Sequence, residues 1–218
     1  MCIRDRTYIF VYTISGDSMK SKVLENKRNK ETALLNSAFD LFTKKDIHSV
    51  TVQDIVKKAN VAKGTFYLYF KDKYQIRDVL IQKEAARLFQ EAREKLEKND
   101  IQNFEDAIIF IINQVLLSLE DNPAILKFIE RNLSWGIFHE QLQTTMDNEE
   151  IGMLQQFTLL AKKSGYTFKR PDIILFIIIE TVGSTCYNSI LYQKPLPFQE
   201  YKPYLFEVIR AILKNYKD

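Results

Sequence analysis

Apolar positions recur along most of this 218-residue chain at the spacing of an amphipathic α-helix. The first stripe runs through residues 27–43, where Leu34, Ala38 and Phe42 lie at successive steps of one helical turn. Later segments with the same periodicity and no strand pattern predict helices at 72–98, 103–120, 123–134, 147–164, 171–192 and 199–216. Proline and glycine, which would interrupt helices, are few. The chain is therefore predicted to be all-α.

Two short helices are expected between the first helix and the long one that starts near Asp72. Thr51 is a good N-cap, and Asp54 at the third helical position completes a pattern like a capping box. Asn60 suits the left-handed turn that would end the helix "VQDIVKKA". A second short helix should then run from about Ala62 to Tyr69. Helix, short turn and helix in this order predict a helix-turn-helix.

The stretch "VAKGTFYLYFKDK" (61–73) combines four aromatic rings with three lysines. On a helix, Ala62, Phe66 and Phe70 share one stripe, which we expect to be core. The side chains expected to point outward are Lys63, Thr65, Tyr67 and Tyr69. Gly64 costs a helix about 1 kcal/mol relative to Ala, which close approach of another backbone would justify. We interpret the outer face as a nucleic-acid contact surface, the alternative being that the tyrosines are half-buried core residues.

Charge is unevenly distributed along the chain. Residues 19–83 hold 14 Lys and Arg against 7 Asp and Glu, whereas residues 84–218 hold 15 against 19. A basic N-terminal part joined to an acidic C-terminal part places a polyanion partner on the former. The alternative is a charged face that contacts only solvent, which would give the same numbers of charged residues.

The segment "TVQDIVKKANVAKGTFYLYFKDKYQIRDVL" (51–80) resembles the DNA-binding domain of the TetR/AcrR family of transcriptional regulators. The shared pattern is a helix started by Thr, a short turn, and then K-G-T-aromatic-Tyr-x-x-Phe-K-x-K. The resemblance covers roughly residues 27–80. It implies a three-helix, helix-turn-helix DNA-binding domain over 19–80, joined by a long helix to a larger all-helical ligand-binding and dimerisation domain over 81–218.

The resemblance also implies roles for individual residues. Lys63, Gly64 and Thr65 would lie at the base edges, and Gln53 would reach a base. Phosphate contacts would come from Thr51, Tyr67 and Lys73. The full DNA-binding set is Thr51, Gln53, Lys63, Gly64, Thr65, Tyr67, Tyr69 and Lys73. The family often has Tyr-His where this chain has Leu68 and Tyr69, so the histidine contact is not carried over. Leu68 would either touch a thymine methyl group or pack.

The last two helices are the expected dimer interface. Helix 171–192 is apolar all round its first two turns and then carries small residues that permit close packing. Two such helices from each of two subunits would form a four-helix bundle. The candidate interface residues are Gly183, Ser184, Tyr204 and Val208. An ordinary monomeric core is the alternative.

A ligand pocket is expected among aromatic and Met residues of the C-terminal part. The candidate lining residues are Phe110, Trp135, Phe138, His139, Met153, Phe157, Glu180 and Tyr187. Plain core packing would produce the same pattern. Glu180 follows seven apolar residues, and a buried carboxylate needs a partner. That partner would be a cationic ligand or a Lys or Arg of the dimer mate.

Other chemistry finds little support in the sequence. Two cysteines and two histidines, far apart, favour neither a disulfide framework nor a metal site, and we expect no metal and no cofactor. No catalytic motif is present, so we do not expect an enzyme. The apolar run "IILFIII" (173–179) is far shorter than the roughly 20 residues of a membrane span. A reducing, cytoplasmic setting is expected.

Residues 1–18 do not match the helical pattern that follows. The hexapeptide "MCIRDR" resembles the translation of a transposase adapter end used in sequencing libraries. We expect a non-native or disordered leader, with Met19 as the native start; a natural disordered tail is the alternative.

Together these features predict a homodimeric transcriptional repressor. It would bind a near-palindromic operator in double-stranded DNA and respond to a small apolar or amphipathic effector, with no membrane involved. The alternatives are a DNA-binding regulator controlled by a protein partner and a helical enzyme.

Overall fold

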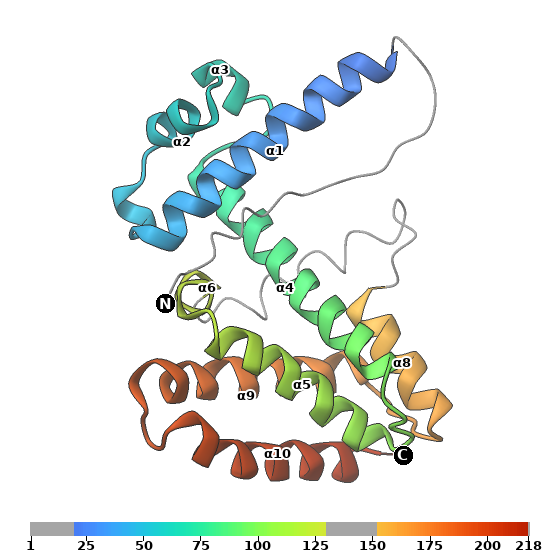
Figure 1. Ribbon diagram of the computed structural model, residues 1–218. Coiled ribbons are helices and arrows are strands. Elements are labelled where there is room, and N and C mark those ends of the chain that lie inside the picture. The colour runs from blue at the N-terminus through green and yellow to red at the C-terminus, as the bar shows by residue number, and fades with distance from the viewer. Residues whose placement is uncertain (1–19, 130–151, 218) are drawn as a thin grey trace. The chain divides into compact units, whose positions relative to one another are not determined.

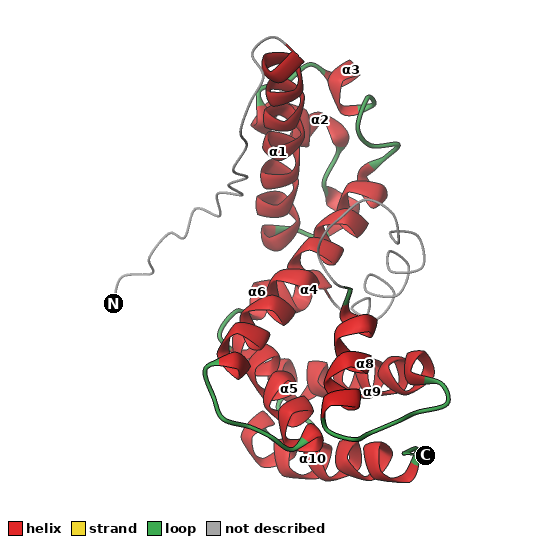
Figure 2. Cartoon of the chain, turned by 90° about the vertical axis from the view of Figure 1, so that its right-hand side faces the viewer, coloured by secondary structure: helices red, strands yellow, loops and turns green. Residues whose placement is uncertain are grey.

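The computed structural model describes residues 20–129 and 152–217, and every regular element in these ranges is a helix (Figures 1 and 2). The all-α prediction is confirmed. The chain divides into two compact units, an N-terminal unit up to Leu80 and a C-terminal unit from Ile81. The predicted leader, residues 1–18, lies outside the described residues.

The N-terminal unit is built on a long first helix. Its elements are α1 (Lys20–Lys44), the 3-10 helix η1 (Ile47–Ser49), α2 (Val52–Ala59), α3 (Lys63–Phe66) and the first part of α4 (Lys73–Glu97). Helix α1 begins earlier than the apolar stripe predicted and packs against α2. The buried side chains of this unit include Leu34, Leu35, Ala38, Phe42, Val50, Ile55, Val56, Phe66, Phe70, Ile76 and Leu80.

Helix α3 is shorter than the sequence predicted. Ala62 is an exposed N-cap in extended conformation, so it does not share the buried stripe of Phe66 and Phe70. After Phe66 the backbone tightens into a turn, in which the amide of Tyr69 donates to the Phe66 carbonyl at 3.0 Å. Asp72 then accepts hydrogen bonds from the amides of residues 74 and 75 and starts α4. Two turns of helix were therefore predicted where one turn forms.

The C-terminal unit contains the rest of α4 and five further described helices. These are α5 (Phe104–Glu120), α6 (Pro123–Ile129), α8 (Met153–Lys163), α9 (Pro171–Tyr192) and α10 (Phe198–Asn215). The ends of α5, α9 and α10 agree with the sequence pattern to within one residue. Helix α8 begins at Met153, because Gly152 is its extended N-cap, rather than near residue 147.

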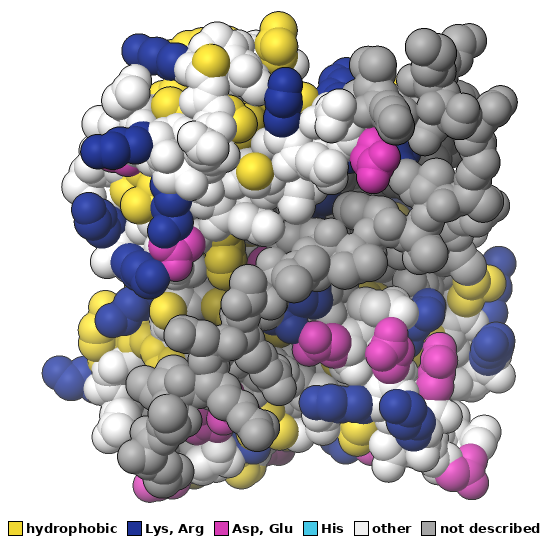
Figure 3. Space-filling model, turned by 45° about the horizontal axis from the view of Figure 1, so that its top comes forward, with side chains coloured by type: hydrophobic (Ala, Val, Ile, Leu, Met, Phe, Trp, Pro, Cys, Tyr) yellow, Lys and Arg dark blue, Asp and Glu magenta, His cyan; other side chains and the backbone are white. Residues whose placement is uncertain are grey.

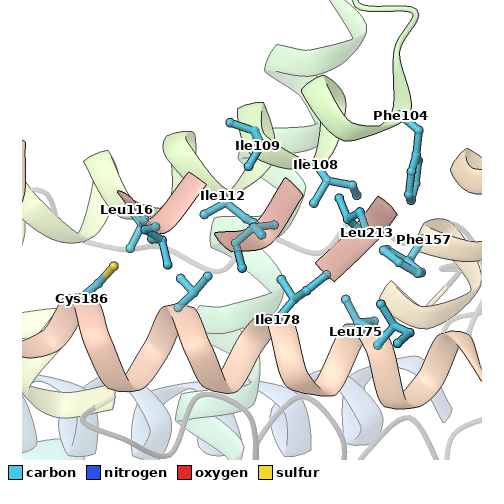
Figure 4. Close-up of a cluster of buried hydrophobic side chains, with 14 of the residues drawn as sticks. Phe104, Ile108, Ile109, Ile112, Leu116, Phe157, Leu175, Ile178, Cys186 and Leu213 are labelled. Atoms are coloured by element: carbon cyan, nitrogen blue, oxygen red, sulfur yellow. The ribbon is translucent and has the colours of Figure 1, made fainter. Parts of the chain in front are cut away.

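A hydrophobic cluster from α5, α8, α9 and α10 forms the core of the C-terminal unit (Figure 4). In the close-up, Phe104, Phe157 and Leu213 lie at one end of the cluster, and Leu116 and Cys186 lie at the other. Helix α9 is long and apolar enough to cross a membrane by length and composition. It supplies buried side chains to this cluster from Ile174 to Cys186, which is the behaviour of a core helix.

A buried carboxylate joins three segments of the C-terminal unit. Glu105, in the first turn of α5, accepts a hydrogen bond of 2.7 Å from the Tyr166 hydroxyl. Two cations of α10 lie near its other oxygen, Arg210 at 3.9 Å and Lys214 at 3.7 Å. Arg210 also pairs with Asp106 at 2.6 Å. The hydrogen bond to Glu105, followed by burial, raises the pKa of Tyr166.

We expect Tyr166→Phe to lower the free energy of unfolding by about 1–3 kcal/mol, because it leaves a buried carboxylate oxygen without its donor. The matched control is Tyr216→Phe, at an exposed tyrosine, which should change stability by less than about 0.5 kcal/mol. Urea unfolding followed by circular dichroism measures both.

The pH dependence gives a second readout of the same variant. Because the folded-state pKa of Tyr166 is raised, its contribution is complete below the unfolded-state value near pH 10 and is lost as the pH rises further. The stability difference between wild type and Tyr166→Phe should therefore be constant at neutral pH and shrink above about pH 10. Equal losses in the Tyr166 and Tyr216 variants would contradict this role.

Candidate nucleic-acid interface and ligand cavity

Helix α2 is fixed at both ends by the caps that the sequence predicted. The Thr51 hydroxyl oxygen accepts from the Asp54 amide at 3.1 Å, and the Asp54 carboxylate accepts from the Thr51 amide at 2.9 Å. Hydrogen bonds from Thr51 lower the pKa of Asp54, which keeps the accepting carboxylate ionised. At the other end, Asn60 adopts the left-handed conformation with φ 54°. Thr51 and Gln53 remain exposed at the start of this rigid helix.

The aromatic residues of 61–73 divide between core and surface. Phe66 and Phe70 are 0% and 4% exposed, whereas Tyr67 is 53% exposed. Leu68 is 78% exposed, so it does not pack within this unit, which was one of the two readings of the sequence. An added Cβ at Gly64 would meet nothing within 4 Å. The surface at Gly64 is therefore open to a close approach from outside.

The hydroxyl of Tyr69 is bound within the N-terminal unit. It donates a hydrogen bond of 2.9 Å to the carbonyl of Lys27 in α1, 42 residues away. Burial, together with Glu31, raises the pKa of Tyr69. Tyr69 thus ties the turn after α3 to the first helix, and its contact with DNA stays a prediction.

Lys73 is likewise engaged with the backbone. Its ammonium group donates to the carbonyls of Ile47, His48 and Val50 at 2.8, 3.1 and 2.9 Å. An ammonium group has three N–H donors, so these bonds use all of them. They hold the segment that leads into the Thr51 cap. The phosphate contact implied for Lys73 stays a prediction, and the geometry adds a positioning role for α2.

Exposed lysines surround the helix-turn-helix. Lys and Arg side chains lie among apolar, uncharged and acidic ones on the face in Figure 3. In the N-terminal unit the exposed lysines include Lys44, Lys45, Lys57, Lys58, Lys63 and Lys71. Asp40 is the partner of two of them, at 2.6 Å from Lys44 and 2.8 Å from Lys58, and these cations keep its pKa low against the opposing effect of burial. This surface suits a polyanion.

A cavity of about 370 Å³ lies within the C-terminal unit, between α4, α5, α8 and α9. Met153 and Phe157 of the predicted lining set border it, whereas Phe110, Glu180 and Tyr187 do not. The expectation that Glu180 is buried does not hold, because this side chain is partly exposed. The remaining predicted residues, Trp135, Phe138 and His139, lie outside the described part of the chain.

Sequence reasoning missed most of the cavity wall, which is aliphatic. Its main contributors are Ala85, Leu88, Leu96, Ile108, Ile111, Ile112, Val115, Leu159, Leu160, Leu175, Ile178, Ile179 and Val182. The predicted lining set consisted mainly of aromatic and Met residues, so it did not include these aliphatic positions. The sequence feature that could have indicated these positions was the apolar stripe of α4, which continues far beyond the N-terminal unit.

The predicted interface residues lie at the surface of the C-terminal unit. Tyr204 and Val208 are 62% and 48% exposed on one side of α10. Ser184 is exposed on α9, and an added Cβ at Gly183 would meet open space.

The described helix-turn-helix, with its basic surface and capped first helix, has the architecture that is typical of all-helical DNA-binding domains. Residues 34–80 match the sequence model of a family described as bacterial regulatory proteins, tetR family. Over these residues the chain is similar to the TetR family.

Curated relatives are also similar to this chain. An uncharacterised HTH-type transcriptional regulator of Bacillus subtilis, YxbF, is 24% identical over 90% of this chain and 52% of its own. The chain spans about half the length of the first curated relatives.

Two solved structures share the fold. A TetR-family transcriptional regulator from Streptomyces coelicolor has a TM-score of 0.61 at 16% identity, covering 86% of this chain and 99% of its own. The regulator FadR from Bacillus subtilis, in complex with stearoyl-CoA, has a TM-score of 0.51 at 15% identity and covers 81% and 96%.

We expect Lys73→Met to lower the free energy of unfolding by about 1–3 kcal/mol, because three carbonyl oxygens lose a charged donor. Lys71→Met is the matched control, since Lys71 is an exposed lysine two positions earlier, and it should change stability by less than about 0.5 kcal/mol. Urea unfolding, with hydrogen exchange of the α2 amides, compares the two. Equal protection of α2 in wild type and Lys73→Met would contradict the positioning role.

Proposed function

We propose that this protein is a homodimeric transcriptional repressor that binds a near-palindromic DNA operator and releases it in response to a small-molecule effector. The observation that carries the proposal is the helix-turn-helix at residues 51–66, with Lys63 and Gly64 exposed and uncrowded on its second helix. The protein would act in the cytoplasm, as a regulator rather than an enzyme.

The exposed side of α3 supports sequence reading in the major groove. A helix fits a groove about 12 Å wide, and Lys is one of the residues that recognise guanine edges there. Buried Phe66 fixes the orientation of this short helix, while Lys63 lies exposed in its first turn. Tyr67 and Leu68, both exposed, follow directly. We assign base contacts to Lys63, Gly64 and Thr65, with Gln53, and phosphate contacts to Thr51 and Tyr67.

Dimerisation through α9 and α10 is supported by apolar side chains that a single chain leaves exposed. Tyr204 and Val208 are one helical turn apart on α10, so they form a stripe. Small residues at Gly183 and Ser184 would allow a second copy of α9 or α10 to approach closely. Two helix-turn-helix units in a symmetric dimer would read the two halves of a palindrome.

The cavity of the C-terminal unit supports the effector. Its volume lies within the range of roughly 300–1,000 Å³ that is usual for small-molecule sites, and its wall is mostly apolar. The structurally similar FadR was solved in complex with stearoyl-CoA, a ligand with a long apolar chain, which supports an apolar effector here. Helix α4 contributes residues both to the N-terminal unit and to the cavity wall. A ligand that favours one position of α4 would shift the population of DNA-binding dimers.

Selection from a random duplex library tests DNA recognition, and we expect it to enrich an inverted repeat. On that site, Lys63→Ala should weaken binding by about 1–3 kcal/mol and relax the preference at one base pair of each half-site. Lys98→Ala, at an exposed lysine of the C-terminal unit, should leave affinity unchanged. Fluorescence anisotropy with matched and mismatched duplexes gives both quantities. An unaltered base preference in Lys63→Ala would rule out the assigned contact.

Gly183→Glu tests the dimer interface. The open space at Gly183 lets a single chain accept the new side chain, whereas an interface would bury an unpaired carboxylate. We expect helical monomers in sedimentation velocity at micromolar concentration. Gln155→Glu introduces the same charge at an exposed position of α8 and should leave the dimer intact. A dimeric Gly183→Glu variant would place the interface elsewhere.

A further inference from the structure

We propose that the cavity of the C-terminal unit binds an anionic amphiphile, a single apolar chain whose negatively charged head group is held by Arg93 and Lys163. The inference rests on the proposed function, because it names the chemical class of the effector. Two features of the cavity carry it: the separation of apolar and charged lining residues, and the incomplete bonding of Arg93.

The body of the cavity suits an apolar group. Sixteen of its twenty lining residues are apolar, and several, including Ile112, Phe157 and Ile178, also belong to the buried core cluster. A polar ligand would leave its hydrogen-bonding groups unsatisfied against such a wall. The shape also favours an elongated ligand, because the lining positions of α4 run from Ala85 to Glu97, about 18 Å at roughly 1.5 Å per residue.

The charged lining residues gather at one end of this length. Along α4, the lining positions from Ala85 to Phe89 are apolar, and Arg93 and Glu97 follow toward its C-terminus. Lys163 is the last residue of α8, and the next residue, Ser164, donates a hydrogen bond to the Gln102 carbonyl just beyond α4. The charged residues that line the cavity therefore all come from the C-terminal parts of α4 and α8.

Arg93 is placed at this end but is not fully bonded. Its Nε atom is buried and has no hydrogen-bond partner in the described part of the chain. The carboxylate of Glu97 lies 3.5 Å from it, beyond the usual hydrogen-bond distance, and is itself 64% exposed. A guanidinium group has five donors in a planar fork that matches a carboxylate or phosphate. A ligand anion would complete the set of acceptors that Glu97 begins.

The balance of charge selects the sign of the head group. Two cations, Arg93 and Lys163, line this end against one carboxylate, Glu97, which already faces Arg93. A cationic head group would meet net repulsion, and a neutral one would leave the excess positive charge at this end unbalanced. A carboxylate and the phosphates of an acyl-coenzyme share the required negative charge, and the experiment separates these two sources.

The test compares ligands that share one chain and differ in the head group. Isothermal titration calorimetry of the full chain would use dodecanoate, dodecanoyl-CoA, 1-dodecanol and dodecyltrimethylammonium, all below their micelle concentrations. We expect at least one anionic probe to bind about tenfold or more tightly than the alcohol, and the ammonium probe to bind weakest. The tighter of the two anions identifies the source of the charge. Equal affinity for alcohol and anions, or binding of none of the probes, would overturn the inference.

Substitutions test whether Arg93 and Lys163 cause the preference for an anionic head group. Arg93→Met and Lys163→Met should each reduce the preference for the anion while leaving 1-dodecanol affinity unchanged, and Arg93→Lys should retain part of it. Lys162→Met is the matched control, because Lys162 is an exposed neighbour that does not line the cavity. Full anion preference in both Arg93→Met and Lys163→Met would overturn the assignment. Thermal unfolding of each variant verifies that it is folded.

Measuring operator binding with the same preparations distinguishes a failure of this inference from a failure of the proposed function. Sequence-specific DNA binding without anion preference would overturn this inference and leave the proposed repressor standing. Anion preference without any operator binding would support the chemistry of the cavity and overturn the proposed function.

Discussion

Helix α4 is the constraint on which the rest of the protein depends, because it supplies buried side chains on both sides of the boundary between the units. Ile76 and Leu80 are buried before the boundary, and Ile81, Ala85 and Leu88 are buried after it. Helix α4 is a continuous helix of 25 residues, and no loop interrupts it at the boundary. The helix that forms part of the N-terminal unit therefore also forms one wall of the cavity.

The helix-turn-helix shows how a helix of only four residues can hold a defined position. An isolated helix of that length is unstable in water, so α3 depends on tertiary anchors. Phe66 and Phe70 provide the buried anchors, and the Tyr69 hydroxyl ties the following turn to α1. Lys73 fixes the segment before α2 through three carbonyls. The anchoring residues thus differ from Lys63, Gly64 and Tyr67, which remain exposed at the surface where we propose DNA contacts.

Local chemistry explains what the sequence could predict. The Thr51–Asp54 capping box, the left-handed Asn60 and the bounds of α9 depend on neighbouring residues, and all were predicted. The features that the sequence did not predict depend on residues that are far apart in the chain.

The bond of Tyr69 to Lys27 spans 42 residues, and those of Lys73 span 23 to 26, so no local pattern indicates that these side chains are engaged. The cavity wall is likewise assembled from four helices, and its aliphatic residues have the same periodicity as any core.

The claim that one helix couples an effector site to DNA recognition is tested most directly by measuring both bindings in one thermodynamic cycle. Operator affinity would be measured by fluorescence anisotropy with and without the tightest-binding anionic probe, and probe affinity by calorimetry with and without operator. If α4 couples the two sites, the probe weakens operator binding and operator weakens probe binding by the same factor. Operator and probe that each bind with unchanged affinity in the presence of the other would contradict it.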